Sequence, residues 1–396
     1  MEGLVTQIKR SPVSRLMLAI TFLVSGVIIN LVQCILYFGV RPFSKFLFRK
    51  INYYLAYSLY CQLVFLAEWW GDTDLLLYID KDDFEKYYGK EHGYLIMNHR
   101  YETDWLVGWL LCERVKLLGN CKTYAKKSIQ YVPTMGWAWR LGESVFLERS
   151  WEKDKETIGR QIRELVEYPD SMWLLLMAEG TRFTQEKHTA SQHFAQEKGL
   201  PDLKHHLTPR TRGFTYSLPY LRGKVGAVYD VQLNFKKDIG PTIMDYLLGK
   251  KIEGHMFMER IPLTEVPEDE EKAAEWLHQL YQRKDRLTDS FFRTGDFFAE
   301  SGVRRIVPFR LRRRYFSLLN TACWAIAVLV PMMYCLICLL TSGSTLYFST
   351  GAGIIAIFFL LLYKMIGMTK ISKASSYGKT ASTPTTDNGN TLKKTD

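Results

Sequence analysis

His99 and Asp104 are the residues whose types and spacing best suit acid–base chemistry. They belong to the polar segment HRYETD, which directly follows the apolar run GYLIMN at 93–98. Positions five apart point in different directions on a helix, so the two side chains can meet only if His99 lies in the turn before one. Asp104 could then accept a hydrogen bond from one ring nitrogen and leave the other free to take a proton. By spacing alone, a surface histidine is the better interpretation.

A second polar turn follows the apolar run WLLLMA at 173–178 and consists of Glu179, Gly180, Thr181 and Arg182. Gly180 lets the backbone approach a ligand closely. Arg182 can hold a phosphate through two parallel hydrogen bonds, and Thr181 can donate another. Glu179 is placed to orient Arg182. Taken alone, the same residues fit a solvated β-turn.

Two further blocks combine apolar and basic residues. Arg149 closes the apolar run VFLER at 145–149, and Pro209 and Arg210 lie in the basic stretch LTPRTRGF at 207–214. Separately, these fit a strand-end arginine in a salt bridge and a basic loop. In open α/β sheets, however, ligands bind beyond the carboxyl ends of the strands. We therefore expect an α/β domain with the polar turns at such an edge.

Three apolar segments are long enough to be membrane helices: 16–38, 317–340 and 345–363. The last two are separated only by 341–344, which predicts a helical hairpin. Segment 52–70 has one apolar helical face and many aromatic residues, so it either lies in the interface or pairs with 16–38. Both outer flanks of the hairpin are basic, which places both of its ends in the cytosol. The flanking residues are Arg304, Arg305, Arg310, Arg312, Arg313, Arg314, Lys364, Lys370 and Lys373.

These segments predict a five-part organisation. The parts are an N-terminal membrane anchor (1–40), an interfacial or second membrane helix (41–75), a cytosolic catalytic domain (76–314), a transmembrane hairpin (315–366) and a disordered cytosolic tail (367–396). The tail ends with Lys393 and Lys394, which resemble the dilysine signal read by the coat-protein retrieval machinery. We therefore expect a multi-pass protein of the endoplasmic reticulum membrane that cycles through the Golgi.

Composition points toward lipid. The net charge of +11 suggests anionic partners, and the 10 Trp and 23 Tyr suit a lipid headgroup zone. Much of the arginine excess lies beside the hairpin, so we expect no nucleic-acid partner. The 7 cysteines are irregularly spaced and imply no disulfide framework. His188, His205 and His206 have no Cys or carboxylate at ligand spacing, so they are surface or structural residues, or part of an anion site, and no metal site is predicted.

The four blocks, in this order, resemble the motifs of the glycerolipid acyltransferase family, and most closely those of the gamma and delta 1-acylglycerol-3-phosphate (lysophosphatidic acid) acyltransferases. The resemblance covers most of the chain and implies an α/β fold with a mixed sheet flanked by helices. Asn98, His99 and Asp104 match an NHxxxxD motif. The other three motifs are matched by Phe146 with Arg149, by Glu179 to Arg182, and by Pro209.

The resemblance implies that His99, oriented by Asp104, removes the proton from the sn-2 hydroxyl of lysophosphatidic acid. That oxygen then attacks acyl-CoA, giving phosphatidic acid, with no metal or bound cofactor. Acyl-CoA, lysophosphatidic acid and membrane lipids are the implied partners. The residues implied to hold the phosphate are Arg149, Thr181 and Arg182; Pro209 and its basic neighbours shape the acyl-CoA site, and Lys126 and Lys127, before Pro133 and Gly136, are further anion-binding candidates.

Four positions depart from the family pattern and leave more than one acceptor compatible with the motifs. They are Tyr101, Glu143, Ala178 and Phe183, where many members have Ser, Gly, Pro and Ser. Another lysophospholipid, such as lysocardiolipin or a lysophosphatidylinositol, is therefore an alternative acceptor. A non-catalytic membrane-shaping protein of the same fold is the alternative from another class. The intact His99–Asp104 pair and the EGTR motif argue against it.

Overall fold

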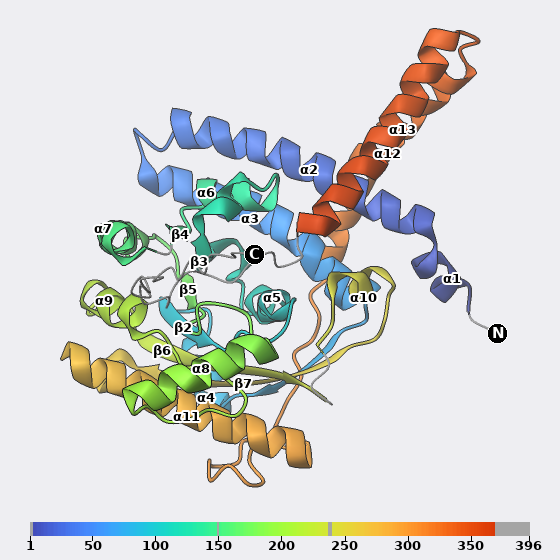
Figure 1. The fold of residues 1–396 in the computed structure, drawn as a ribbon. Helices are drawn as coiled ribbons and strands as arrows, with labels where there is room; N and C mark the ends of the chain where they lie inside the picture. The colour runs from blue at the N-terminus through green and yellow to red at the C-terminus, as the bar shows by residue number, and fades with distance from the viewer. Residues whose placement is uncertain (1–2, 149, 237–239, 369–396) are drawn as a thin grey trace, which may run out of the picture.

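A computed structural model describes residues 3–148, 150–236 and 240–368 of the chain. Within these residues, seven strands form one sheet with helices on both faces (Figure 1). The strands are β1 (Asp74–Tyr78), β2 (Gly93–Met97), β3 (Cys121–Lys126), β4 (Val145–Leu147), β5 (Trp173–Leu176), β6 (Ala227–Phe235) and β7 (Glu253–Pro262). The helices are α1 (Leu4–Arg10), α2 (Pro12–Gly39), α3 (Lys45–Phe65), η1 (Leu66–Trp70, a π-helical turn), α4 (Lys81–Tyr87), α5 (Asp104–Arg114), η2 (Leu118–Asn120), η3 (Lys127–Tyr131), α6 (Met135–Leu141), α7 (Trp151–Leu165), α8 (Gln185–Lys198), α9 (Thr211–Leu221), α10 (Ile243–Leu247), η5 (Leu263–Glu265), α11 (Glu270–Thr294), α12 (Phe316–Thr341) and α13 (Thr345–Met368).

The sheet is mixed, as predicted. Its strand order is β1-β7-β6-β2-β5-β3-β4, and every neighbouring pair is parallel except β6 with β7. At the start of β2, Gly93 pairs with Trp173 of β5 on one side and with Ala227 of β6 on the other. Because β2 and β5 are parallel neighbours, the polar turns that follow them emerge at the same edge of the sheet.

Strand β2 is buried on both faces, which explains why its sequence is a continuous apolar run. Successive side chains point to opposite faces. Tyr94 and Ile96 join the core cluster formed with α7, α9 and α11, whereas Leu95 and Met97 join the cluster formed with α3 and α5. The site at the end of β2 is therefore mounted on a strand that is held from both sides.

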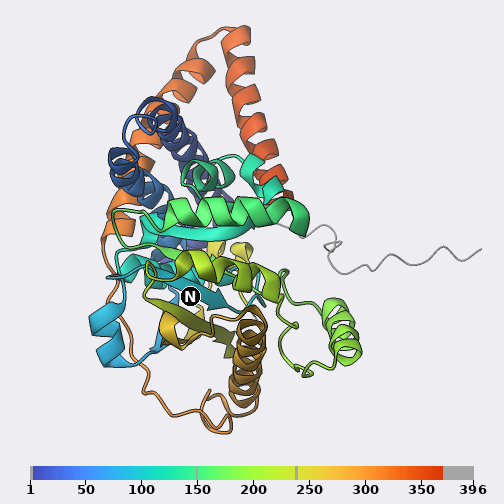
Figure 2. The same cartoon turned by 90° about the vertical axis from the view of Figure 1, so that its left-hand side faces the viewer.

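Helices α2 and α3 form an antiparallel pair along one side of the domain (Figures 1 and 2). Buried polar side chains join them: Gln62 donates to Ser25 at 2.9 Å, and Gln33 donates to Asn52 at 2.8 Å. Segment 52–70 thus pairs with 16–38, one of the two arrangements that the sequence left open. Large apolar side chains remain exposed on α2, namely Val27, Ile28, Leu31, Val32, Ile35 and Phe38.

The hairpin formed by α12 and α13 projects beyond the domain (Figures 1 and 2). Among the described helices, α2 and α12 are long and apolar enough to cross a membrane. The segment before α12 lies against the sheet, because Leu77 of β1 and Phe309 exchange two backbone hydrogen bonds of 2.9 Å. We call residues 308–314 the strap. Arginines predicted as topology signals also fix the strap, since Arg310 pairs with Asp74 at 2.7 Å.

Candidate active site

The site begins where β2 ends. Asn98, a buried residue, continues the sheet with its side chain: its amide nitrogen donates to the Leu233 carbonyl at 3.0 Å, and its amide oxygen accepts from the Leu233 N–H at 2.8 Å. These two hydrogen bonds to β6 fix the direction in which the backbone leaves the sheet. His99 is therefore the first residue of the turn that precedes α5.

His99 and Asp104 meet as predicted. Asp104 is the first residue of α5, and its Oδ2 lies 2.9 Å from Nδ1 of His99. The Asp104 carboxylate is fully buried, whereas a quarter of the His99 side chain is exposed. A carboxylate only accepts hydrogen bonds, so it selects the tautomer with the proton on Nδ1. The Nε2 atom is left with a lone pair that can take a proton.

The surroundings of His99 raise its pKa. Burial of the imidazole lowers the pKa, but the Asp104 carboxylate favours the charged ring through charge and hydrogen bonding, and the Glu179 carboxylate adds to this. Arg182 acts in the opposite direction. The net effect places the pKa above the ordinary value of 6.5. The ring is thus a stronger base than a free histidine.

The turn after β5 is bonded directly to the backbone of His99. The His99 N–H donates to Oε1 of Glu179 at 2.9 Å, and the His99 carbonyl accepts from the Phe183 N–H at 2.8 Å. The other oxygen of Glu179 accepts from the Leu207 N–H at 3.3 Å. The expected role of Glu179 in orienting Arg182 is therefore corrected, since both carboxylate oxygens are engaged by backbone N–H groups. The ion-pair partner of Arg182 is Glu102, at 3.7 Å.

Gly180 has a φ of +70°, a conformation that suits glycine. A Cβ at this position would lie 2.9 Å from Cδ of Arg210, so the arginine side chain passes directly over the turn. The Arg210 N–H also donates to the Ala178 carbonyl at 2.8 Å. The structure therefore brings the third and fourth motifs together, with Pro209 in the connecting segment.

Lys187 in the first turn of α8 is a site residue that the sequence reasoning missed. Its Nζ donates to Oγ1 of Thr181 at 2.8 Å and to the Arg182 carbonyl at 3.2 Å. The only indication in the sequence was a lysine five residues after Arg182. The turn before α8 then brings the Lys187 side chain back to Thr181 and Arg182. Lys187 thus ties the start of α8 to the EGTR turn, and Arg182 of that turn is close enough to act on the charge of the His99 ring.

Arg149 of the second motif lies outside the described residues. The backbone on both sides of it is fixed, because Asp154 of α7 accepts from the N–H groups of Glu148 and Ser150, at 2.7 and 3.1 Å. Lys127, an anion-binding candidate, forms an ion pair with Glu148. Lys393 and Lys394 of the retrieval-like signal also lie outside the described residues.

The three histidines noted in the sequence have partners within the fold. His188 contacts the Leu203 carbonyl at 2.6 Å, His205 contacts Asp289 at 3.0 Å, and His206 contacts Asp285 at 3.0 Å. Both carboxylates come from α11, which explains why local spacing did not reveal them. The Asp285 carboxylate also accepts from the backbone N–H groups of Lys204 and His205, each at 2.8 Å, so it holds the segment that leads to Leu207.

Two departures from the family pattern have structural explanations. Tyr101 packs edge-on against Phe235, with ring centroids 4.8 Å apart. Glu143 has a φ of +63°, which accounts for the glycine common in the family. Its carboxylate accepts from Nε of Arg41 and Nε of Arg49, both at 2.8 Å. Glu143 therefore joins the α2–α3 pair to the β3–β4 side of the sheet.

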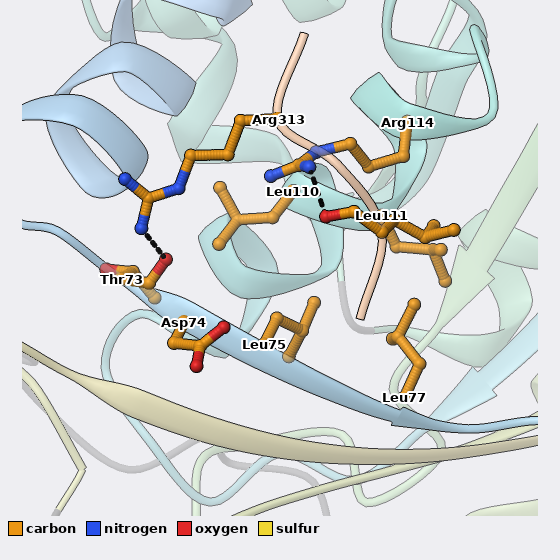
Figure 3. A pocket seen from close by; sticks show the side chains of 9 residues that line it. Thr73, Asp74, Leu75, Leu77, Leu110, Leu111, Arg114 and Arg313 are labelled. Carbon is orange, nitrogen blue, oxygen red and sulfur yellow. Dashed lines mark hydrogen bonds between the residues drawn. The ribbon is translucent and has the colours of Figure 1, made fainter. Parts of the chain in front are cut away.

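A pocket beside the strap is separate from this site (Figure 3). Leucines of β1 and α5 form its walls, and Arg114 and Arg313 reach across it, donating to the carbonyls of Leu311 at 2.8 Å and Thr73 at 3.0 Å. Its volume of about 30 Å³ is enough for a water molecule but not for a lipid or coenzyme. The pocket is therefore not a substrate site.

Comparisons with known proteins agree with the motifs. Residues 79–228 match the Acyltransferase family model, and residues 245–324 match the Acyltransferase C-terminus model. The chain is 45% identical over 377 residues to the human 1-acyl-sn-glycerol-3-phosphate acyltransferase gamma, covering 95% of this chain and 98% of that protein. It is 44% identical over 379 residues to the bovine delta protein, covering 95% of this chain and 97% of that protein.

Among solved structures, the 1-acyl-sn-glycerophosphate (LPA) acyltransferase from Thermotoga maritima matches with a TM-score of 0.41 and 13% identity, covering 70% of this chain and 97% of that one. The two family models and the close relatives define an acyltransferase enzyme. More particularly, the chain belongs to the 1-acyl-sn-glycerol-3-phosphate acyltransferase family and resembles its gamma and delta members, as its motifs predicted.

Proposed function

We propose that this enzyme transfers a fatty acyl group from acyl-CoA to the sn-2 hydroxyl of lysophosphatidic acid and thereby makes phosphatidic acid. The observation that carries the proposal is the 2.9 Å contact between Nδ1 of His99 and the buried Asp104 carboxylate. It leaves Nε2 as a base on a ring that is partly exposed to substrate. The names of the gamma and delta relatives support the choice of acceptor.

The proposed reaction is a direct transfer. Nε2 of His99 takes the hydroxyl proton while the hydroxyl oxygen forms a bond to the thioester carbon. The carbon–sulfur bond then breaks, and the leaving thiolate of coenzyme A takes the proton back from the imidazolium. Asp104 stabilises the charged ring between these two steps. Exchange of a thioester for an oxygen ester is favourable in itself, so the proposal includes no metal or bound cofactor.

The phosphate of lysophosphatidic acid is proposed to lie against Thr181 and Arg182, with Arg149 as a further ligand. Glu179 and Gly180 shape this turn, as their contacts with the backbone of His99 and with Arg210 indicate. A bound phosphate would hold the sn-2 hydroxyl next to His99, so that proton transfer takes place within one complex and does not depend on a chance encounter. Pro209 and Arg210 are proposed to border the acyl-CoA site.

We also propose that the enzyme resides in the endoplasmic reticulum membrane, with its catalytic domain and C-terminus in the cytosol. The exposed apolar helices α2 and α12 support membrane residence. Acyl-CoA is a cytosolic substrate, and the bilayer supplies the lysolipid. Retrieval from the Golgi by coat proteins through Lys393 and Lys394 completes this proposal.

The proposal is tested with membranes that carry the wild-type chain or His99→Ala, labelled oleoyl-CoA and a panel of lysophospholipids. We expect labelled phosphatidic acid from the wild type, and a loss of at least about 10²-fold in the variant. Equal incorporation by both chains would contradict the catalytic role of His99. Incorporation only into lysocardiolipin or lysophosphatidylinositol would replace the acceptor, and no incorporation into any acceptor would favour the membrane-shaping alternative.

A further inference from the structure

A row of aromatic rings and arginines runs along the outer surface of α7 and α9, and we call it the α7–α9 track. It begins with Arg212, whose Cζ lies 5.9 Å from the ring of Trp151. Trp151 packs edge-on against Tyr216 at 5.3 Å, and Tyr216 lies 5.7 Å from Tyr220. At the far end, Cζ of Arg163 lies 5.0 Å above the ring of Tyr220.

The track is not part of the core between the two helices. That core is made by apolar side chains that are almost fully buried, namely Ile158, Ile162, Phe214 and Leu218. The three rings of the track are only partly buried, and Arg163 and Arg212 are exposed. Within the described part of the chain, neither guanidinium forms an ion pair, so both are available to an anion.

The track starts at the active-site edge of the sheet. Trp151 opens α7, two residues after Arg149 of the second motif, and Arg212 lies in the first turn of α9. The N–H of Arg210, just before α9, donates to the carbonyl of Ala178 next to the EGTR turn. Arg163 comes twelve positions after Trp151 on the same helix, so the track extends about 18 Å away from the site.

Aromatic faces with arginines suit one kind of ligand. Arginine binds phosphate groups, and aromatic side chains and guanidinium planes stack on nucleobases. Acyl-CoA carries its thioester at one end and a phosphorylated adenosine at the other, with the extended pantetheine arm between them. Building on the proposed function, we propose that the α7–α9 track binds the nucleotide end of acyl-CoA, so that the arm leads back along the helices and the thioester lies beside His99.

The test compares two donors at saturating lysophosphatidic acid with the purified full-length enzyme. Oleoyl-CoA carries the nucleotide, whereas oleoyl-pantetheine carries the same thioester without it. In the Arg163→Gln/Arg212→Gln variant we expect the KM for oleoyl-CoA to rise at least about tenfold, with kcat and the KM for oleoyl-pantetheine unchanged. The matched control is Arg286→Gln/Arg304→Gln, which removes the same charge from exposed positions elsewhere and should leave both KM values unchanged.

An unchanged KM for oleoyl-CoA in the track variant, or an equal rise for both donors, would overturn the proposal while leaving the proposed reaction intact. Failure of the wild type to use oleoyl-CoA would instead overturn the proposed function. Calorimetry with adenosine 3′,5′-bisphosphate tests the track without turnover. The wild type should bind this probe at least about tenfold more tightly than the track variant, and equal binding would overturn the proposal.

Discussion

Three contacts hold His99, one from α5 and two from the turn after β5. Asp104 of α5 accepts from the ring, Glu179 after β5 accepts from the backbone N–H, and Phe183 donates to the backbone carbonyl. A base held at three points loses little entropy when the substrate arrives, which favours the positioned reaction. The precision of this site therefore depends on the turn after β5 as much as on the His99–Asp104 pair.

Asp104→Asn should change the pH profile as well as the rate. The base must be neutral, so activity falls as pH drops through the pKa of His99, which lies above 6.5. Asparagine carries no negative charge, so the pKa of His99 should fall and the acid limb should move to lower pH. We expect kcat/KM on the plateau to drop by about 10²–10⁴-fold. Rate measurements between pH 5 and 9 check this, and an unmoved acid limb would argue against the charge effect of Asp104.

Glu179→Gln tests the clamp on the backbone of His99. The glutamine has one acceptor oxygen, so either the His99 or the Leu207 N–H would face an NH₂ group. We expect a loss of about 1–3 kcal/mol in the free energy of unfolding and a lower kcat with nearly unchanged KM. Kinetics and thermal unfolding measure both, with the exposed Glu186→Gln in α8 as control. If KM rose while kcat stayed constant, Glu179 would be a binding residue instead.

The sequence predicted the His99–Asp104 contact because it is local: five residues and one turn determine it. It could not predict Lys187 or Asp285 in the same way. Lys187 reaches Thr181 only because the turn before α8 folds back, and Asp285 reaches the His206 segment from α11, 79 residues later. The prediction that Glu179 orients Arg182 was wrong for a similar reason. The carboxylate oxygens of Glu179 accept from backbone N–H groups, which every residue type except proline has, so the sequence carries no signal for them.

At the scale of elements, a buried group of ion pairs joins the α2–α3 pair to the sheet. Glu143, before β4, bonds to Arg41 and Arg49 of the α2–α3 region, and Arg49 also lies 4.3 Å above the ring of Tyr168. The side chains of Glu143 and Arg49 are 7% and 3% exposed, so neither charge is solvated on its own. Such a pair is costly to break from one side only.

The variant Glu143→Gly measures the free energy lost when the Glu143–Arg49 ion pair is broken from one side. Glycine relieves the backbone at a φ of +63°, but it leaves the Arg49 guanidinium buried without its carboxylate. We expect a net loss of about 2–4 kcal/mol in the free energy of unfolding. The double variant Glu143→Gly/Arg49→Met removes the stranded charge and should recover a large part of the loss, as thermal unfolding in detergent would show. A single variant as stable as the wild type would contradict the expected net loss, because the ion pair would then contribute no more than the backbone relief that glycine provides.

The elements themselves were partly predictable. The apolar runs at 93–98 and 173–178 correspond to strands, because a continuous apolar run bounded by polar turns fits a strand buried on both faces. The position of 52–70 remained open, since its apolar face fits a bilayer surface or a partner helix equally well. The polar contacts Ser25–Gln62 and Gln33–Asn52 show that this segment packs against α2, and no local pattern identifies such pairs.

At the scale of the whole molecule, two apolar units attach to one catalytic domain. The α2–α3 pair lies along the domain, whereas the α12–α13 hairpin projects beyond it (Figures 1 and 2). The strap leads into α12, whose first turns also pack against α3, where Asn320 and Trp324 donate to Ser58. Composition and length predicted the hairpin. The strap was not predicted, because its arginines were fully accounted for by membrane topology.

Removal of the hairpin should not release the enzyme from membranes. A chain that ends after residue 314 keeps the exposed apolar side chains of α2, such as Leu31, Ile35 and Phe38. We expect this truncated chain to remain in the membrane fraction after alkaline carbonate extraction, as the full-length chain should. If it appeared in the supernatant while the full-length chain stayed behind, the hairpin would be the sole anchor.

The strand order has a consequence for the biosynthesis of the chain. The partner of β1 in the sheet is β7, so Asp74 cannot pair until Glu253 has been synthesised. The outer edge of β1 remains unpaired until Phe309 has been synthesised. The ribosome must therefore complete most of the chain before the sheet can close, long after α2 has emerged. Contacts this distant in sequence slow folding and leave an unpaired strand exposed in the meantime. We infer that the first helices hold the nascent chain at the membrane before β7 has been synthesised and the sheet of the catalytic domain can form.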